Sequence, residues 1–157
     1  WAIVAGAPKP AEGVIELPLA KMGLGDREMM PPADPKDPRA EPAETEYVTI
    51  ARAAQRVTWL GLRPHTGRTH QLRAHMKAIG HPILGDPKYG DEKSAQLSEG
   101  LKLQLHARSI LLPHPSAGML HVEAPLSPEM KAGFAKFGFS EDEADQNPFA
   151  RRQIKRR

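Results

Sequence analysis

Residues 63–90 read Arg63-Pro-His-Thr-Gly-Arg-Thr-His-Gln-Leu-Arg-Ala-His-Met-Lys-Ala-Ile-Gly-His-Pro-Ile-Leu-Gly-Asp-Pro-Lys-Tyr-Gly90. This stretch holds four of the seven histidines of the chain and five lysine or arginine side chains. Its start is typical of the end of a strand, its middle of a short helix and its end of a turn rich in proline and glycine. Basic side chains along such a helix are suited to hold a polyanion, so this stretch is the first candidate for a functional site.

The helix in the middle of the stretch is predicted to run from His70 to about Ile79. Thr69 is placed to cap its N-terminus, Gly80 lies just beyond its end, and Pro82 prevents its continuation. At 100° per residue, one side of this helix is basic and the other is apolar. The basic side carries His70, Arg73 and Lys77, and the apolar side, which we expect in the core, carries Leu72, Met76 and Ile79, with His75 at its edge.

Three interpretations of the basic side follow from the residues alone. It can be a solvated helix face, a metal site, or a face that binds phosphate or carboxylate. A metal site is disfavoured because the histidines are spaced by five and six residues, which does not align them on one helix face, and no cysteine completes a ligand set. Residues 46–115 hold ten basic and five acidic side chains, and this local excess supports anion binding. The four histidines are His65, His70, His75 and His81.

The rest of the chain predicts an α+β fold, mostly antiparallel sheet with a few short helices. Residues 22–45 contain five prolines and little apolar content, which predicts an exposed loop. Residues 139–157 turn acidic and then basic, which predicts a disordered tail. A helix is expected to begin after Ser127, with Pro128 in its first turn, and to stop at Gly138. Strands are predicted at residues 1–5, 14–17, 46–51, 57–62, 101–105, 109–112 and 119–123, with a hairpin turn at residues 52–56.

The composition excludes some classes of protein. With 39% hydrophobic and 26% charged residues, the chain has a globular balance, and it has no apolar run of membrane-spanning length. It has no cysteine, so it has no disulfide, no thiolate metal site and no cysteine nucleophile. This fits a reducing, cytoplasmic compartment.

The run Thr66-Gly-Arg-Thr-His-Gln-Leu-Arg73, followed by His75-Met and by Gly80-His-Pro-Ile-Leu-Gly-Asp86, resembles the third conserved block of the RluA-type RNA pseudouridine synthases. Shorter matches extend the resemblance over about residues 1–130, so that residues 1–138 are interpreted as the C-terminal portion of the catalytic domain. These matches include residues 1–6, 13–18, 43–47, 105–107, 113–115 and 124–126.

The resemblance implies an enzyme that detaches a uracil base within RNA, turns it and rejoins it through C5. The family uses an aspartate nucleophile and a flipped-out base, with no cofactor and no metal. Arg73 matches the arginine that pairs with this aspartate, and ribosomal RNA is the expected substrate, with transfer RNA as an alternative. We expect Arg63, Arg68, His70 and Lys77 to contact the RNA.

The nucleophile itself is missing from the pattern. The family carries it in an Arg-Leu-Asp segment upstream of the first strand, and nothing in this chain matches that segment. Asp26 and Asp86 are the nearest lookalikes, and we expect Asp86 to shape a turn. The sequence therefore predicts that the chain alone is inactive and that strands of the missing part pair with residues 1–5. The alternative from another functional class is a non-catalytic RNA-binding module that keeps only the basic helix.

Overall fold

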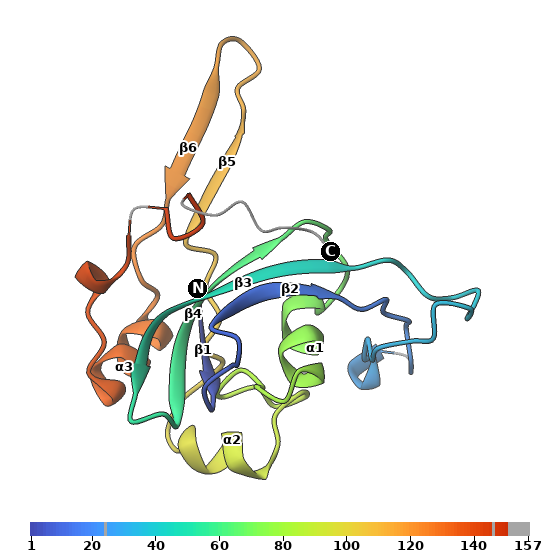
Figure 1. The fold of residues 1–157 in the computed structure, drawn as a ribbon, viewed down its shortest axis with the longest axis horizontal. Helices are drawn as coiled ribbons and strands as arrows, with labels where there is room; N and C mark the ends of the chain where they lie inside the picture. Colours follow the sequence, from blue (N-terminus) through green and yellow to red (C-terminus); the bar gives the residue numbers. More distant parts are fainter. Residues whose placement is uncertain (24, 146, 151–157) are drawn as a thin grey trace.

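Four antiparallel strands form the main sheet of the protein, in the order β1-β4-β3-β2. The structure is a computed structural model that describes residues 1–23, 25–145 and 147–150. The two longest strands, β3 and β4, make a hairpin in the middle of the sheet (Figure 1). The predictions of an α+β fold and of these four strands are confirmed. The strands are β1 (Ala2–Ala5), β2 (Glu12–Glu16), β3 (Glu44–Ala53) and β4 (Val57–Pro64).

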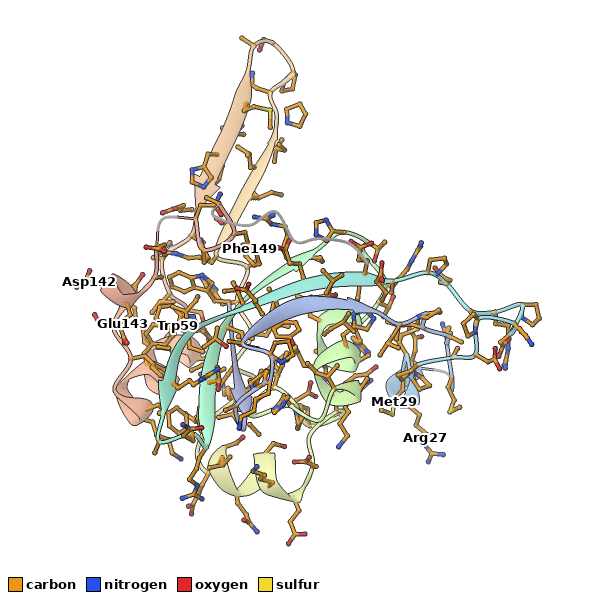
Figure 2. All side chains as sticks on the ribbon, in the orientation of Figure 1. Arg27, Met29, Trp59, Asp142, Glu143 and Phe149 are labelled. Atoms are coloured by element: carbon orange, nitrogen blue, oxygen red, sulfur yellow. The ribbon has the colours of Figure 1, made fainter. Side chains whose placement is uncertain are left out.

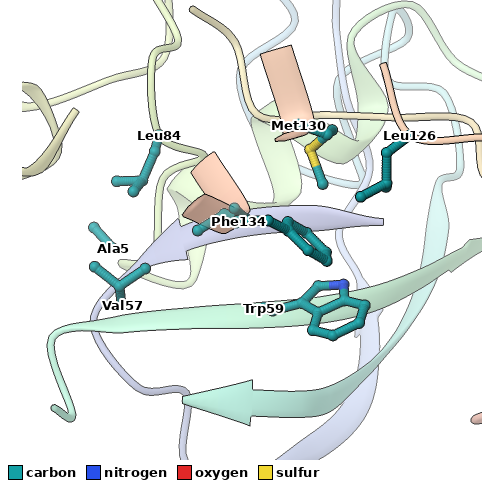
Figure 3. Packing of buried hydrophobic residues seen from close by; sticks show 8 residues of the cluster. Ala5, Val57, Trp59, Leu84, Leu126, Met130 and Phe134 are labelled. Atoms are coloured by element: carbon teal, nitrogen blue, oxygen red, sulfur yellow. The ribbon is translucent and has the colours of Figure 1, made fainter. Parts of the chain in front are cut away.

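Short helices complete the fold, and two of them bury the opposite faces of the sheet. Alternate residues of β1 point to opposite faces, so Ile3 belongs to one buried cluster and Val4 to another. Trp59 of β4 packs edge-on against Phe134 of the third helix, with ring centroids 4.6 Å apart (Figure 3). Met76 of the first helix packs on the other face, against Leu60 and Tyr47. The helices are α1 (Gln71–Ala78), α2 (Glu92–Leu97) and α3 (Pro128–Phe137), and no described helix is long and apolar enough to cross a membrane.

The second edge of β1 is occupied by two segments of this chain. Ala5 N–H donates to Pro82 O at 3.0 Å, and Ile3 N–H donates to Gln104 O at 3.1 Å. The prediction that strands of a missing part pair with residues 1–5 is therefore wrong, because this edge is already taken. The predicted strand at residues 101–105 is wrong as well. Gln104 N–H donates instead to Leu84 O, so this segment bridges two different neighbours and forms no ladder with either.

A two-stranded hairpin projects from the body of the molecule (Figure 1). It consists of β5 (Ser109–Pro113) and β6 (Met119–Glu123), which pair antiparallel from Ser109↔Glu123 to Pro113↔Met119. Both strands were predicted at these positions. Apart from half-buried Leu112, the residues of both strands are exposed, so the hairpin contributes little to the core.

The proline-rich loop is less exposed than its composition predicts. Met30 is 3% exposed and Ala43 is 4% exposed, and both pack with Leu19 and Tyr89. Two backbone hydrogen bonds join Leu19, just before the loop, to Glu41 near its end: the Leu19 N–H donates to Glu41 O, and the Leu19 carbonyl accepts from Glu41 N–H. The prediction of an exposed loop over residues 22–45 is thus wrong at Met30 and Ala43, where apolar side chains reach the core. Figure 2 labels Arg27 and Met29 in this loop.

The described residues at the end of the chain, 139–145 and 147–150, make contacts with the rest of the molecule. Phe139 packs against Trp59 and Phe134, with ring centroids 6.0 and 5.9 Å apart. Phe149, labelled in Figure 2, places its ring centroid 4.1 Å from Cζ of Arg63. Both aromatic residues are half-buried, Phe139 beside Trp59 and Phe134 and Phe149 beside Arg63, and the prediction of a disordered tail did not anticipate these contacts. The basic residues 151–157 lie outside the described residues.

Candidate active site

Helix α1 begins one residue later than predicted, and its N-terminus is organised by a glutamine. The N-cap is His70, which has φ 52° in the left-handed region and makes no side-chain cap bond. Gln71 Oε1 accepts instead from Arg68 N–H at 3.0 Å and from the Thr66 hydroxyl at 2.7 Å. The prediction of Thr69 as the cap is therefore wrong. Gly80, with φ 81°, follows the helix as predicted.

A buried polar network fixes α1 to the sheet. Gln71 Nε2 donates to Glu44 O at 2.9 Å and to Thr45 Oγ1 at 3.0 Å. Thr45 Oγ1 lies 2.9 Å from Nδ1 of His75, whose Nε2 lies 2.9 Å from Leu17 O. Because Leu17 O only accepts, Nε2 carries the proton, and Nδ1 accepts from the threonine hydroxyl. Burial lowers the pKa of His75, so the ring is held neutral.

The apolar side of α1 was only partly predicted from the helical periodicity. Met76 is fully buried, and Ile79 is half-buried against the same cluster. Leu72 is also half-buried but belongs to no buried cluster of the described residues. The buried side of the helix instead includes Gln71 and His75, because their polar groups find partners on the sheet.

Arg73 makes a bidentate ion pair with Asp86. Its Nε donates to Oδ2 at 2.7 Å, and its Nη2 donates to Oδ1 at 2.6 Å. The Asp86 side chain is fully buried and the Arg73 side chain is 14% exposed. Asp86 Oδ1 also accepts from Lys88 N–H at 2.9 Å and Tyr89 N–H at 3.0 Å, so Asp86 shapes a turn as predicted. Burial would raise the pKa of Asp86, but the bonds from Arg73 and the two N–H groups lower it.

This geometry fixes the guanidinium and identifies the edge that can take a second anion. The bonds to Asp86 use the Nε–Nη2 edge, and the Nη1–Nη2 edge is the other edge that can bind a carboxylate with two parallel bonds. The hydrogen bond to Asp86 raises the pKa of Arg73, so its positive charge is permanent. A fixed cation with one remaining bidentate edge is suited to orient an anionic nucleophile.

Tyr89 connects the arginine to the proline-rich loop and to His70. Its ring centroid lies 5.0 Å from Cζ of Arg73. Its hydroxyl accepts from Met30 N–H at 2.9 Å and lies 3.1 Å from Nδ1 of His70, to which it can donate. Desolvation, followed by the charges of Arg73 and Lys88, lowers the pKa of His70 and favours the neutral ring that accepts this bond.

The other residues predicted to contact RNA lie beside carboxylates. Arg63 Nη1 and His65 Nε2 lie 3.3 and 3.2 Å from Glu46 Oε2. Arg68 Nη1 lies 2.8 Å from Glu41 Oε2, and Lys77 Nζ lies 3.6 Å from Asp91 Oδ2. These side chains remain 36–43% exposed, and so do the carboxylates of Glu41 (52%) and Asp91 (39%), which a phosphate could replace, whereas Glu46 is only 8% exposed. Among the described residues, no group of three or more His, Asp or Glu side chains could hold a metal ion.

The two aspartates that resemble a nucleophile differ in position. Asp86 is buried and accepts four hydrogen bonds, so it has no exposed oxygen with which to attack a substrate. Asp26 lies in the short 3-10 turn η1 (Gly25–Arg27) of the proline-rich loop. Asp86 therefore does not replace the nucleophile that the sequence pattern lacks.

Comparison with known proteins identifies the family. Residues 1–78 match the RNA pseudouridylate synthase family. The dual-specificity RNA pseudouridine synthase RluA of Salmonella typhi is 42% identical over 113 residues, which are 72% of this chain and 49% of that protein. The chain belongs to the RluA-type RNA pseudouridine synthases. It spans about half the length of the curated RluA relatives that it matches.

Two further comparisons agree with this family. An uncharacterised RNA pseudouridine synthase of Zymomonas mobilis is 39% identical over 127 residues, or 80% of this chain and 55% of that protein. The solved structure of human RNA pseudouridylate synthase domain containing 1 superposes with a TM-score of 0.69 at 26% identity. It covers 83% of this chain, and the match covers 56% of the human chain. The fold of this RluA-type chain is therefore the fold of a pseudouridine synthase domain.

The sequence indicated some residues of this site and missed others. Arg73 was predicted, but its partner Asp86 was expected only to form a turn. Gln71, Thr45 and Tyr89 were not predicted as parts of the site. The block holds Gln71 and Tyr89, but spacing along a chain does not show which strand or loop each side chain reaches across space.

Proposed function

We propose that this RluA-type chain supplies the arginine of a uridine-isomerising site, and that an aspartate from polypeptide outside residues 1–157 is the nucleophile. The observation that supports this is the geometry of Arg73. Asp86 holds one edge of the guanidinium, and the Nη1–Nη2 edge is the one suited to bind another carboxylate. A carboxylate bound there stays ionised and is oriented for attack on the sugar of the flipped nucleotide.

In this proposal, the other residues of the site either hold Arg73 in position or bind RNA. Asp86 and the ring of Tyr89 fix the guanidinium. Arg63, Arg68, His70 and Lys77 contact the RNA, whose phosphates compete with the exposed carboxylates that now pair two of them. The reaction uses neither metal nor cofactor. The RluA relatives carry the name dual-specificity RNA pseudouridine synthase. We propose ribosomal RNA as the substrate of this protein in the cytoplasm.

The test requires a longer protein. In the extended protein, the portion of Escherichia coli RluA that the resemblance places upstream of Trp1 is fused in front of residues 1–157. Rejoining uracil through C5 releases the hydrogen from C5. Release of tritium from RNA that carries it at C5 of uracil therefore measures turnover. Ribosomal and transfer RNA transcripts are compared. We expect turnover by the extended protein on ribosomal RNA and none by residues 1–157 alone.

Arg73→Lys separates the effect of the guanidinium geometry on turnover from the effect of its positive charge. It keeps the positive charge but loses the bidentate geometry, so we expect turnover to fall by about a hundredfold or more while RNA affinity changes little. Arg52→Lys, at an exposed position near the end of β3, is the matched control. Unchanged turnover with Arg73→Lys would contradict the role of Arg73. RNA binding without turnover by the extended protein would favour the non-catalytic module.

A further inference from the structure

The chain has four phenylalanines, and Phe149 differs from the other three in what it packs against. Phe134, Phe137 and Phe139 belong to the buried apolar cluster around α3 or pack against it. Phe149 is half-buried but belongs to no apolar cluster of the described residues. Its ring lies instead on the guanidinium of Arg63, whose Cζ is 4.1 Å from the ring centroid. The position of this ring is therefore set by a cation and not by the core.

The guanidinium of Arg63 is held in place by the sheet. Its Nη1 donates to Glu46 Oε2 at 3.3 Å, and Nε2 of His65 lies 3.2 Å from the same oxygen. Glu46 is buried, so its carboxylate is poorly placed to give way to a phosphate. The Arg63 side chain nevertheless remains 41% exposed. A fixed guanidinium of this kind presents its flat face to a ligand.

Gly61 provides the space for a ring beside this guanidinium. Gly61 and Arg63 lie on the same face of β4, because side chains two residues apart on a strand point the same way. A Cβ at Gly61 would lie 3.3 Å from Cε2 of Phe149 and 3.0 Å from Cγ1 of Val48. Both distances are tighter than ordinary van der Waals contact, so a side chain here would displace the ring or the valine. We call Val48, Gly61 and Arg63 the Arg63 platform.

The segment that carries Phe149 is weakly attached to the platform. Phe149 N–H donates to Asn147 Oδ1, and Ala150 N–H donates to Asn147 O, both at 3.0 Å. Within the described part of the chain, the hydrogen bonds of residues 147–150 join this segment only to itself. The ring is thus held by van der Waals contact and by a cation–π contact, which is weak at a partly exposed site. A ligand that stacks better can therefore displace it.

The platform and its occupant also differ in their relation to the family. Val48, Gly61 and Arg63 lie within residues 1–78, which match the RNA pseudouridylate synthase family, whereas Phe149 lies outside them. The platform is therefore part of the synthase domain, and the ring on it comes from a different part of the chain. The excess of basic side chains in residues 46–115 favours RNA over a protein aromatic residue as the displacing ligand.

We propose that the Arg63 platform is a nucleobase-stacking site for single-stranded RNA, and that Phe149 fills it when RNA is absent. Bases of single-stranded RNA stack on guanidinium planes and on other flat surfaces. The ring of Phe149 shows that a six-membered ring fits on the platform. Arg63 then contacts a base and not a phosphate. The inference rests on the proposed function only in taking RNA as the ligand, and it involves no catalytic residue.

Phe149→Ala tests the proposal, because it removes the competing ring and changes no charge. Binding of fluorescein-labelled decauridylate to residues 1–157 is measured by fluorescence anisotropy. We expect Phe149→Ala to bind about two- to fivefold more tightly than the unchanged chain, because an internal competitor lowers the apparent affinity by the fraction of open sites. Phe137→Ala is the matched control, since Phe137 is also half-buried with a cation, Lys136 Nζ, 6.0 Å from its ring centroid. It should leave the affinity unchanged.

Further comparisons separate stacking from charge. An abasic decamer with the same ribose-phosphate backbone should bind the unchanged chain and Phe149→Ala equally. Adding Arg63→Lys to Phe149→Ala should remove the gain for decauridylate, because lysine keeps the charge but has no flat face. Phe149→Trp should bind decauridylate no more tightly than the unchanged chain, because tryptophan is the better cation–π partner.

Each other outcome overturns the proposal. Equal or weaker binding of decauridylate by Phe149→Ala would show that the ring does not compete with RNA. An equal gain for the abasic decamer would identify a phosphate contact, and no binding by any variant would remove the site. Fluorine NMR of fluorophenylalanine-labelled residues 1–157 gives the same test without a substitution, because decauridylate should shift the Phe149 signal and the abasic decamer should not. None of these readouts depends on turnover, so their failure is distinct from inactivity of the extended protein.

Discussion

Helix α1 and the hairpin β5–β6 differ in how far their side chains find partners within the chain. Around α1, the buried polar groups of Gln71, His75 and Asp86 all find partners inside the chain. On the hairpin, apolar side chains such as Leu111 are left in water. The buried polar groups of the first region have partners within the described residues, whereas the apolar side chains of the second remain exposed. A site can therefore be organised around its arginine by contacts between segments that lie far apart in the sequence.

Removing the charge of Asp86 tests whether the α1 region is self-sufficient. Asp86→Asn leaves the guanidinium of Arg73 partly buried without its counter-ion, and we expect a loss of about 3–5 kcal/mol in the free energy of unfolding. Urea denaturation of residues 1–157 measures this loss. Asp37→Asn is the control, because Asp37 pairs with Arg39 on an exposed loop, where an ion pair contributes little to stability. Similar effects of the two substitutions would show that the buried pair contributes nothing special.

The buried Trp1 amine, beside Arg108 at the base of the hairpin, predicts a pH dependence. In a protein that begins at Trp1, burial, with a smaller contribution from Arg108, lowers the pKa of this amine from 8.0 to about 6. The unfolded chain therefore binds the proton first as the pH falls, so stability is lost between about pH 8 and pH 6. A shift of this size corresponds to about 2–3 kcal/mol. Denaturation at several pH values measures the loss, and acetylation of Trp1 should remove it. A slope that acetylation does not change would contradict the burial of this amine.

His75 tests the polar network with a smaller expected effect. His75→Leu has a similar size but leaves Leu17 O and one bond of the Thr45 hydroxyl without a partner, so we expect a loss of about 2 kcal/mol. His114→Leu, at the exposed tip of the hairpin, is the matched control and should change stability by less than about 0.5 kcal/mol. Thermal unfolding of the two variants at one pH makes the comparison. A stable His75→Leu protein would show that the network is dispensable.

The sequence predicted the parts of the fold that depend on local patterns. Alternation located β3, β4, β5 and β6, and the Ser-Pro start and Gly138 bounded α3. Residues 101–105 alternate equally well but form no strand, because Gln104 O accepts from Ile3 N–H while Gln104 N–H donates to Leu84 O, so the segment is divided between two neighbours. Alternation within one segment does not show whether a neighbouring strand is placed to form a ladder of backbone hydrogen bonds with it.

The same limit applies to the site. The resemblance to the third conserved block of the family identified Arg73. Helical periodicity, in contrast, assigned Leu72 to the core and predicted no role for Gln71. Burial of Gln71 and His75 depends on Thr45, which lies 26 and 30 positions away in the chain. Likewise, alternation predicted the strands of the hairpin but not that their apolar side chains are exposed. Long-range pairing decides both regions.

Leu111→Lys gives the smallest effect in this chain and the sharpest test of the comparison. Because Leu111 is 63% exposed, the substitution should change the stability of residues 1–157 by less than about 0.5 kcal/mol. Met76→Lys, at a fully buried position of α1, is the contrasting variant and should cost more than about 3 kcal/mol, because it leaves an unpaired charge in the core. Urea denaturation of the two variants measures the difference. Similar losses would mean that the apolar side chains of the hairpin are packed rather than exposed.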